Sequence, residues 1–98
     1  MIECPACHGS VTEEIFLSAC SDFWPEVRVV YFTCPLCGDR TEARLEHSRI
    51  SLGYIYAAGA PHFCGMVDVE VEGLTVSSGG RELEAELDGQ KWVIGARE

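Results

Sequence analysis

Four cysteines in two short motifs are the residues of this chain whose types and spacing point most directly to chemistry. The motifs are Cys4-Pro5-Ala6-Cys7 and Cys34-Pro35-Leu36-Cys37, and 26 residues, 8–33, separate them. Two thiolates from one tight turn can bind the same ion, and a second such turn completes a tetrahedral shell of four sulfurs, usually around Zn²⁺. The sequence therefore predicts one structural zinc site with the ligands Cys4, Cys7, Cys34 and Cys37.

The residues around the cysteines suit a tight turn that points sulfurs and backbone N–H groups at one ion. A proline after the first cysteine of each pair restricts φ, and Gly38 after the second pair permits a left-handed residue. The first pair has His8 at the corresponding place, followed by Gly9. A shell closed by four sulfurs leaves no position for water or substrate, so the site is predicted to be non-catalytic. The same shell suits a single iron ion, which keeps an electron-transfer alternative open.

Together with Gly38, the two motifs resemble those of the zinc-ribbon superfamily, in which two such turns hold one zinc at the end of a small antiparallel sheet. The resemblance covers about residues 1–47, and small bacterial proteins of the CpXC type look similar in their paired motifs. The spacing exceeds the usual ~15–20 residues, which implies a longer hairpin between the pairs. The second pair also resembles rubredoxin-like iron proteins, but these normally carry glycine after both pairs, where this chain has His8. Ribbons of this kind occur in transcription proteins, ribosomal proteins, chaperone components and enzymes, so the resemblance implies a metal and not a role.

Length and composition decide whether the metal supplements a core or replaces one. The chain has 98 residues, of which 47% are hydrophobic, enough for a single domain, 1–98, with a modest core of its own. No apolar run approaches the ~20 residues that span a bilayer, and the N-terminus lacks the pattern of a signal peptide. Reduced, metal-bound cysteines and a cytoplasmic location are therefore expected, in preference to disulfide bonds.

The charge balance disfavours nucleic acid as a partner. Sixteen acidic residues against seven basic ones give a net charge of −9, and Lys91 is the only lysine. Nucleic-acid affinity rests mainly on basic side chains that neutralise phosphates. The nucleic-acid alternative would require four arginines to gather on one face: Arg28, Arg40, Arg44 and Arg49.

Patterning in the first half predicts strands around the cysteine pairs. Residues 11–20 and 27–33 are expected to be strands, and 21–25 is rich in turn formers. Residues 41–47 alternate between the two faces expected of a half-buried strand. The alternative for this last segment is a short helix capped by Thr41, because its residues are also good helix formers.

Patterning in the second half predicts an antiparallel meander over 48–98. A strand from Ile50 is followed by a loop, and alternating strands are expected at 67–72, 74–77 and 82–87. Gly79 and Gly80 fall in one turn, and Asp88-Gly89 predicts a type I′ hairpin into 91–94. The fold class is thus mostly β: zinc-ribbon hairpins in 1–47 continued by a meander. The predicted shared core of the meander comprises Val67, Val69, Val71, Leu83, Leu87, Trp92 and Ile94.

Two surfaces are candidates for binding a protein partner. One is an acidic row expected on a single solvent face of paired strands, which would either be merely solvated or meet a basic partner. Its residues are Asp68, Glu70, Glu72, Glu82, Glu84, Glu86 and Asp88. The other is an aromatic loop around Phe23-Trp24. The favoured function is a non-catalytic binding or assembly module with a protein partner, which is basic if the acidic row is the contact surface, and with no membrane. The oligomeric state does not follow from the sequence.

The remaining cysteines and histidines favour structural interpretations. Cys20 and Cys64 are expected to be small buried residues. His62 lies two positions before Cys64, which leaves a thiolate-imidazole enzyme as a further alternative. His8 and His47 are expected on the surface or on a sheet face.

Overall fold

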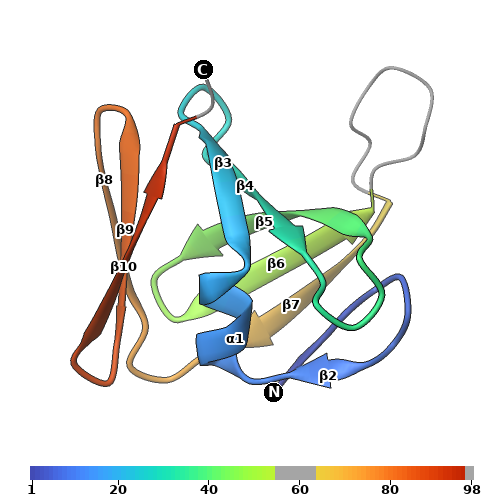
Figure 1. Ribbon diagram of the computed structural model, residues 1–98. Coiled ribbons are helices and arrows are strands. Elements are labelled where there is room, and N and C mark those ends of the chain that lie inside the picture. The colour runs from blue at the N-terminus through green and yellow to red at the C-terminus, as the bar shows by residue number, and fades with distance from the viewer. Residues whose placement is uncertain (55–63, 97–98) are drawn as a thin grey trace.

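The computed structural model describes residues 1–54 and 64–96 of the chain. It confirms the predicted class, because the chain is mostly β, its sheets are antiparallel, and it forms one compact small domain. The strands form sheets of two, five and three members (Figure 1). Within the described residues, no helix has the length and apolar character needed to cross a membrane.

The chain begins with a small hairpin and one short helix. Strand β1 (Ile2–Glu3) pairs with β2 (Ser10–Val11), and helix α1 (Glu13–Ser18) follows directly. Thr12 caps the helix, since its Oγ1 accepts a hydrogen bond from the backbone N–H of Ile15 at 3.2 Å. Two glutamates in the first turn also suit the positive end of the helix dipole. The strand predicted over 11–20 was therefore wrong for its larger part.

The five-stranded sheet is built from consecutive neighbours. Its order along the chain and in space is β3 (Cys20–Trp24), β4 (Val29–Thr33), β5 (Arg40–Glu46), β6 (Arg49–Tyr54) and β7 (Cys64–Glu70). Each strand pairs with the next in antiparallel fashion. The sheet is thus a meander whose edge strands are β3 and β7. Phe23 of β3 also forms an isolated bridge with Ala96.

The turn between β3 and β4 lies further along the chain than the sequence predicted. The turn predicted at 21–25 is wrong, because these residues form most of β3. Their turn-forming character appears instead as a shift in register between Ser21 and Trp24, with Asp22 at a φ of 54°. The chain reverses at 25–28, where Arg28 has a φ of 57°. The strand predicted at 27–33 is confirmed from Val29 onward.

The segment after the second cysteine pair is a strand, so the alternative of a helix capped by Thr41 is wrong. In β5, Thr41, Ala43 and Leu45 are buried on the core side, in the predicted alternation. Glu42 lies on the opposite side and is nevertheless only 7% exposed. The segment is a strand because it pairs with both β4 and β6. Local helix propensity does not reflect such pairing with other segments.

The three-stranded sheet contains β8 (Thr75–Gly79), β9 (Glu82–Leu87) and β10 (Gln90–Gly95), in the order β10-β9-β8. Asp88 and Gly89 link the last two strands with φ values of 52° and 78°. A type I′ turn requires positive φ at both central residues, so this predicted turn is confirmed. The expected short strand at 74–77 is confirmed as β8, which runs two residues further.

Backbone hydrogen bonds attach the three-stranded sheet to the larger one at two places. Between β5 and β6, the N–H of Ser48 donates to the carbonyl of Leu74 at 3.2 Å, and Val71 N–H donates back to Ser48 at 3.0 Å. At the other end, Ala96 forms a parallel bridge with Phe23 of β3. The small sheet therefore lies beside the large one, with β10 next to β3 in Figure 1.

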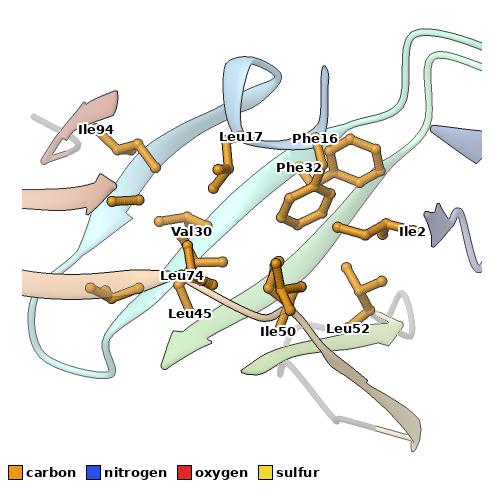
Figure 2. Packing of buried hydrophobic residues seen from close by; sticks show 14 of the residues in the cluster. Ile2, Phe16, Leu17, Val30, Phe32, Leu45, Ile50, Leu52, Leu74 and Ile94 are labelled. Carbon is orange, nitrogen blue, oxygen red and sulfur yellow. The ribbon is translucent and has the colours of Figure 1, made fainter. Parts of the chain in front are cut away.

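A single hydrophobic core joins all parts of the molecule (Figure 2). Near the N-terminal hairpin, Phe16 of α1 packs on Phe32 of β4 with ring centroids 4.5 Å apart, beside Ile2. Further along the same face of the large sheet, the side chains of β8 to β10 continue the cluster. The helix and the small sheet thus cover neighbouring parts of one sheet face.

The predicted core of the second half is confirmed except at its edge. Four of its residues are buried, namely Val71, Leu83, Leu87 and Ile94, while Val69 and Trp92 are partly buried against the cluster. Val67 is 54% exposed, because β7 is an edge strand. The acidic row does not form one face of paired strands as predicted, since β7 and β9 belong to different sheets.

Candidate metal centre

The two cysteine pairs lie in turns that the fold brings together. The first pair occupies the loop between β1 and β2, and the second occupies the loop between β4 and β5; both loops lie at the same end of the molecule in Figure 1. The four sulfur atoms all lie within 4.8 Å of one another. The structure thus assembles the four residues predicted as ligands, Cys4, Cys7, Cys34 and Cys37, into one cluster.

The first turn is held by backbone hydrogen bonds that orient its sulfurs. The N–H of Cys4 donates to the carbonyl of Gly9, and His8 N–H donates to the carbonyl of Cys4, both at 2.8 Å. Gly9 N–H points at the sulfur of Cys7 at 3.4 Å. His8 adopts a φ of 62°, the left-handed conformation that the sequence required of a residue in this place.

The second turn repeats this arrangement. The N–H of Cys34 donates to the carbonyl of Asp39 at 3.0 Å, and Gly38 N–H donates to the carbonyl of Cys34 at 2.8 Å. Leu36 N–H points at the sulfur of Cys34 at 3.4 Å, and Gly38 has a φ of 78°. Two turns with the same hydrogen-bond pattern therefore face each other and present backbone donors to the sulfurs.

The sulfur positions fit a tetrahedral ion. Cys4 Sγ lies 3.8 Å from Cys37 Sγ, and Cys7 Sγ lies 3.9 Å from Cys34 Sγ. A zinc–sulfur bond of about 2.3 Å places tetrahedral neighbours about 3.8 Å apart. A disulfide would require about 2.05 Å, and all four are free thiols. The donor set and its spacing thus fit a divalent ion and exclude disulfides within the cluster.

Thiols so close together compete for ionisation, because each thiolate disfavours a second negative charge beside it. Burial acts to raise the pKa of Cys34, but the N–H groups of Cys37 and Leu36 and bonds from neighbouring thiols bring it to about 7. The Asp39 N–H favours the thiolate of Cys37, yet desolvation and the other three thiols raise its pKa to about 12. Burial also raises the pKa of Cys4. A bound cation would remove this competition, because metal binding favours thiolates at every ligand.

The centre has a buried side and an exposed side. Cys4 and Cys34, the first cysteine of each pair, are fully buried and belong to the hydrophobic core. Cys7 and Cys37 are exposed. The core therefore holds one half of the cluster in place, while the other half lies at the surface.

A close contact between the two turns was not apparent from the sequence. A Cβ at Gly9 would lie 2.5 Å from Leu36 Cδ1 and 3.3 Å from the sulfur of Cys7. Leu36 is itself 60% exposed, so its side chain lies over the first turn at the surface. The paired motifs predicted that the turns meet, but only the fold shows which residue of one turn packs on the other.

The other cysteines and histidines do not join the cluster as far as the chain is described. Cys20 donates its S–H to the carbonyl of Phe16 at 3.2 Å, and burial raises the pKa of its thiol. His8 has a side chain that is 74% exposed, in agreement with its expected place at the surface. His62 lies outside the described residues, and only the backbone of Cys64 is described, so the enzyme alternative remains a prediction.

The aromatic loop predicted around Phe23-Trp24 is wrong as a surface feature. Phe23 is only 1% exposed, because it points from β3 into the core. Trp24 is half-buried on the opposite side of the strand and meets the ring of Tyr31 edge-on, with centroids 6.4 Å apart. Neither residue forms an exposed recognition loop.

A cleft of about 590 Å³ lies away from the cysteines, between the 25–28 turn, the end of β5 and β8. It is lined by Glu26, Val27, Arg28, Arg44, Leu45, Glu46, His47 and Val76. Its described lining carries charges of both signs and contains no cysteine or hydroxyl nucleophile. This cleft could not be predicted from the sequence, because its residues come together only when the two sheets pack.

The geometry of the four cysteines is compatible with a pair of zinc-ribbon-like knuckles. Comparison of the chain with protein-family models, with curated proteins and with solved structures found no match. The assignment of the centre therefore rests on the sulfur positions and on the hydrogen bonds of the two turns.

Proposed function

We propose that this chain is a non-catalytic binding or assembly module in which one structural Zn²⁺ is held by Cys4, Cys7, Cys34 and Cys37. The observation that carries the proposal is the convergence of the four sulfurs, with separations of 3.8 and 3.9 Å between the two turns. Four protein ligands close the tetrahedral shell, so the ion has no position for substrate. The metal's role is to attach the N-terminal hairpin to the β4–β5 loop.

The proposal of a protein partner rests on charge and on the arginines of residues 1–54 and 64–96, which do not assemble into a basic surface. By strand register, Arg40, Arg44 and Arg49 share the outer face of the large sheet. Carboxylates interrupt them: Arg40 Nη2 lies 2.6 Å from Asp22 Oδ2, and Glu46 stands opposite Arg49. A phosphate backbone requires uncompensated basic groups, and the whole chain carries −9. These features favour a protein partner over a nucleic acid.

Metal analysis of the purified native chain tests the central part of the proposal. We expect one zinc per chain and none in the variants Cys7→Ser and Cys37→Ser, which alter exposed ligands. Cys20→Ser is the matched control, because Cys20 is a cysteine outside the cluster whose bond to Phe16 a hydroxyl can replace. A coloured protein with one iron would instead support the electron-transfer alternative. A chain that binds no metal under reducing conditions would refute both.

The reduced state of the centre also suggests where the protein works. Free thiols close to one another persist in a reducing compartment and are converted to disulfides in oxidising ones. The five described cysteines are free. We therefore propose a cytoplasmic location, which labelling of the protein in fractionated source cells would test.

A further inference from the structure

Strand β8 lies at the edge of the three-stranded sheet. The backbone groups on its outer side have hydrogen-bond partners only at the start of the strand, among the described residues. At the start of the strand, the carbonyl of Leu74 accepts from Ser48, and Val76 N–H points at His47 Nδ1 at 3.4 Å. Both groups point away from β9. Because edge groups alternate with a period of two, the N–H and carbonyl of Ser78 point the same way. Among the described residues, no backbone group hydrogen-bonds to Ser78 from that side.

The sheet next to this edge carries a ladder of three carboxylates on its outer face. In β9 the buried residues are Leu83, Ala85 and Leu87, so the side chains between them face outward. Those side chains are Glu82, Glu84 and Glu86. On β8 the residues directly opposite them are small, namely Gly79, Ser77 and Thr75 in the same order. The ladder is therefore accessible across β8.

The negative charge of the ladder is largely uncompensated. Lys91 Nζ lies 3.5 Å from Glu84, and it is the one described cation within ion-pair distance of the three carboxylates. Alternate residues of a strand lie about 6.8 Å apart. That is less than the Debye length of about 8 Å at physiological salt. The three carboxylates therefore act on an approaching charge together.

We propose that the open edge of β8 binds an extended basic segment of a partner protein, which adds as a fourth strand beside Ser78. This inference rests on the protein-binding part of the proposed function, and it does not depend on the metal. An added strand would lie about 4.8 Å from β8 and about 10 Å from β9. Lysine or arginine at alternate positions would extend over Ser77 and Gly79 toward the ladder, whereas Lys91 reaches Glu84 from the other side of β9, across a single interstrand gap.

A basic partner fits this edge better than a second copy of the chain does. Two copies paired through β8 would leave both carboxylate ladders uncompensated, because β8 itself carries no basic side chain that could extend over its neighbour to a ladder. The edge strand β7 differs because its carboxylates lie next to a hydroxyl donor or opposite a basic residue. Ser51 Oγ donates to Asp68 at 2.7 Å, and Glu70 stands opposite Arg49. The uncompensated ladder thus favours β8 over β7 as the binding edge and favours a partner of positive charge.

A short peptide of defined sequence tests the proposal. The probe is a nine-residue peptide of alternating lysine and threonine with blocked ends, titrated into the ¹⁵N-labelled metal-loaded protein in 50 mM salt. We expect shifts centred on the amides of Ser78 and its neighbours. Raising the salt to 500 mM should weaken binding about tenfold or more, because the attraction is between exposed charges.

Two controls separate strand addition from general attraction. The variant Glu82→Gln, Glu84→Gln and Glu86→Gln should weaken binding about tenfold or more. A charge-matched variant, Glu3→Gln, Glu14→Gln and Glu70→Gln, should weaken it no more than about threefold, because these residues lie on β1, α1 and β7 and not on β8, β9 or the turn that leads into β8. A peptide N-methylated at alternate residues keeps its charge but lacks edge donors, and it should bind about tenfold more weakly.

Equal loss of binding in both glutamine variants would overturn the proposal, and so would shifts that avoid β8 or equal affinity of the methylated peptide. Formation of dimers by the free chain through β8 would also contradict it. The zinc content of both variants is measured in parallel. Full zinc with no peptide binding would refute this inference and leave the metal proposal intact, whereas absent zinc with peptide binding would do the reverse.

Discussion

Removal of the metal should destabilise the protein without abolishing its fold. The ion would join the loop before β2 to the loop before β5, and these loops are distant in the chain. Most of the core lies outside this connection, since α1 and all three sheets contribute to the buried cluster. We therefore expect the metal-free chain to keep its β structure and to unfold at a lower temperature.

The size of the effect follows from the length of chain that the metal closes. Cys7 and Cys34 are 27 positions apart. If the closure is treated as a cross-link in the unfolded-chain entropy model, it contributes about 3.6 kcal/mol at 25 °C. For a domain of this size each kcal/mol shifts Tm by about 4–8 °C. The expected decrease in Tm is therefore about 15–30 °C. Because about 3.6 kcal/mol is less than the usual total stability of about 5–15 kcal/mol, the metal-free chain should remain folded at 25 °C.

Thermal unfolding followed by far-UV circular dichroism measures this decrease. The protein is kept under a non-thiol reductant, and samples with zinc are compared with samples treated with a chelator. Cys7→Ser should behave like the chelated protein and should respond little to zinc. Cys20→Ser should respond to zinc like the parent chain, because it retains all four ligands.

Two results would refute the reasoning. If zinc is shown to leave the protein and Tm changes by less than about 3 °C, protein contacts alone hold the two turns together and the cross-link contributes almost nothing. If the metal-free chain has no cooperative transition at 25 °C, the metal is required for folding and does not merely supplement the core.

Three further predictions concern the core, a buried carboxyl and a turn. Phe32→Ala should cost about 3–5 kcal/mol in urea unfolding, because Phe32 is fully buried against Phe16; a loss below 1 kcal/mol would contradict this packing. Burial raises the pKa of Glu42, so stability is lost as pH rises from the ordinary carboxyl pKa through the raised value. Glu42→Gln should therefore raise Tm at pH 7 and leave it nearly unchanged at pH 4, and equal effects at both values would count against it. Gly89→Ala should cost about 1–2 kcal/mol in the same urea assay, since Gly89 has a φ of 78°, and an unchanged midpoint would argue against the type I′ turn.

Several features were predictable from the sequence because they depend on a few neighbouring residues. The left-handed conformations of His8 and Gly38 follow from the way a Cys-Pro-x-Cys turn must reverse. The Asp88-Gly89 hairpin follows from the positive φ that both residues tolerate. The helix α1 was missed although its signal was present, since Thr12 followed by two glutamates is a typical helix start. Its six residues are too few for periodicity to distinguish them from a strand.

Other features could not be predicted because they depend on which segments pack together. The exposure of Val67 is decided by the place of β7 at the edge of its sheet. The burial of Phe23 is decided by the packing of β3 under the small sheet, for which a run of turn-forming residues gives no indication. Five of the seven residues of the acidic row lie on strands, in β7 and β9, whereas Glu72 and Asp88 lie in turns. The division of the row between two sheets is a property of topology.

The sequence by itself determined that four thiols would be available in two matching turns, and that strands would dominate, since both follow from local chemistry and from a period of two. Only the tertiary structure decided that the sulfurs come within 4.8 Å, with one cysteine of each pair buried and the other exposed. It also decided that β8 ends a sheet beside an accessible ladder of carboxylates. The physical reason is that the spacing within a motif determines which ion its side chains can bind. The distance between two motifs and their solvent exposure depend on the packing of the whole core.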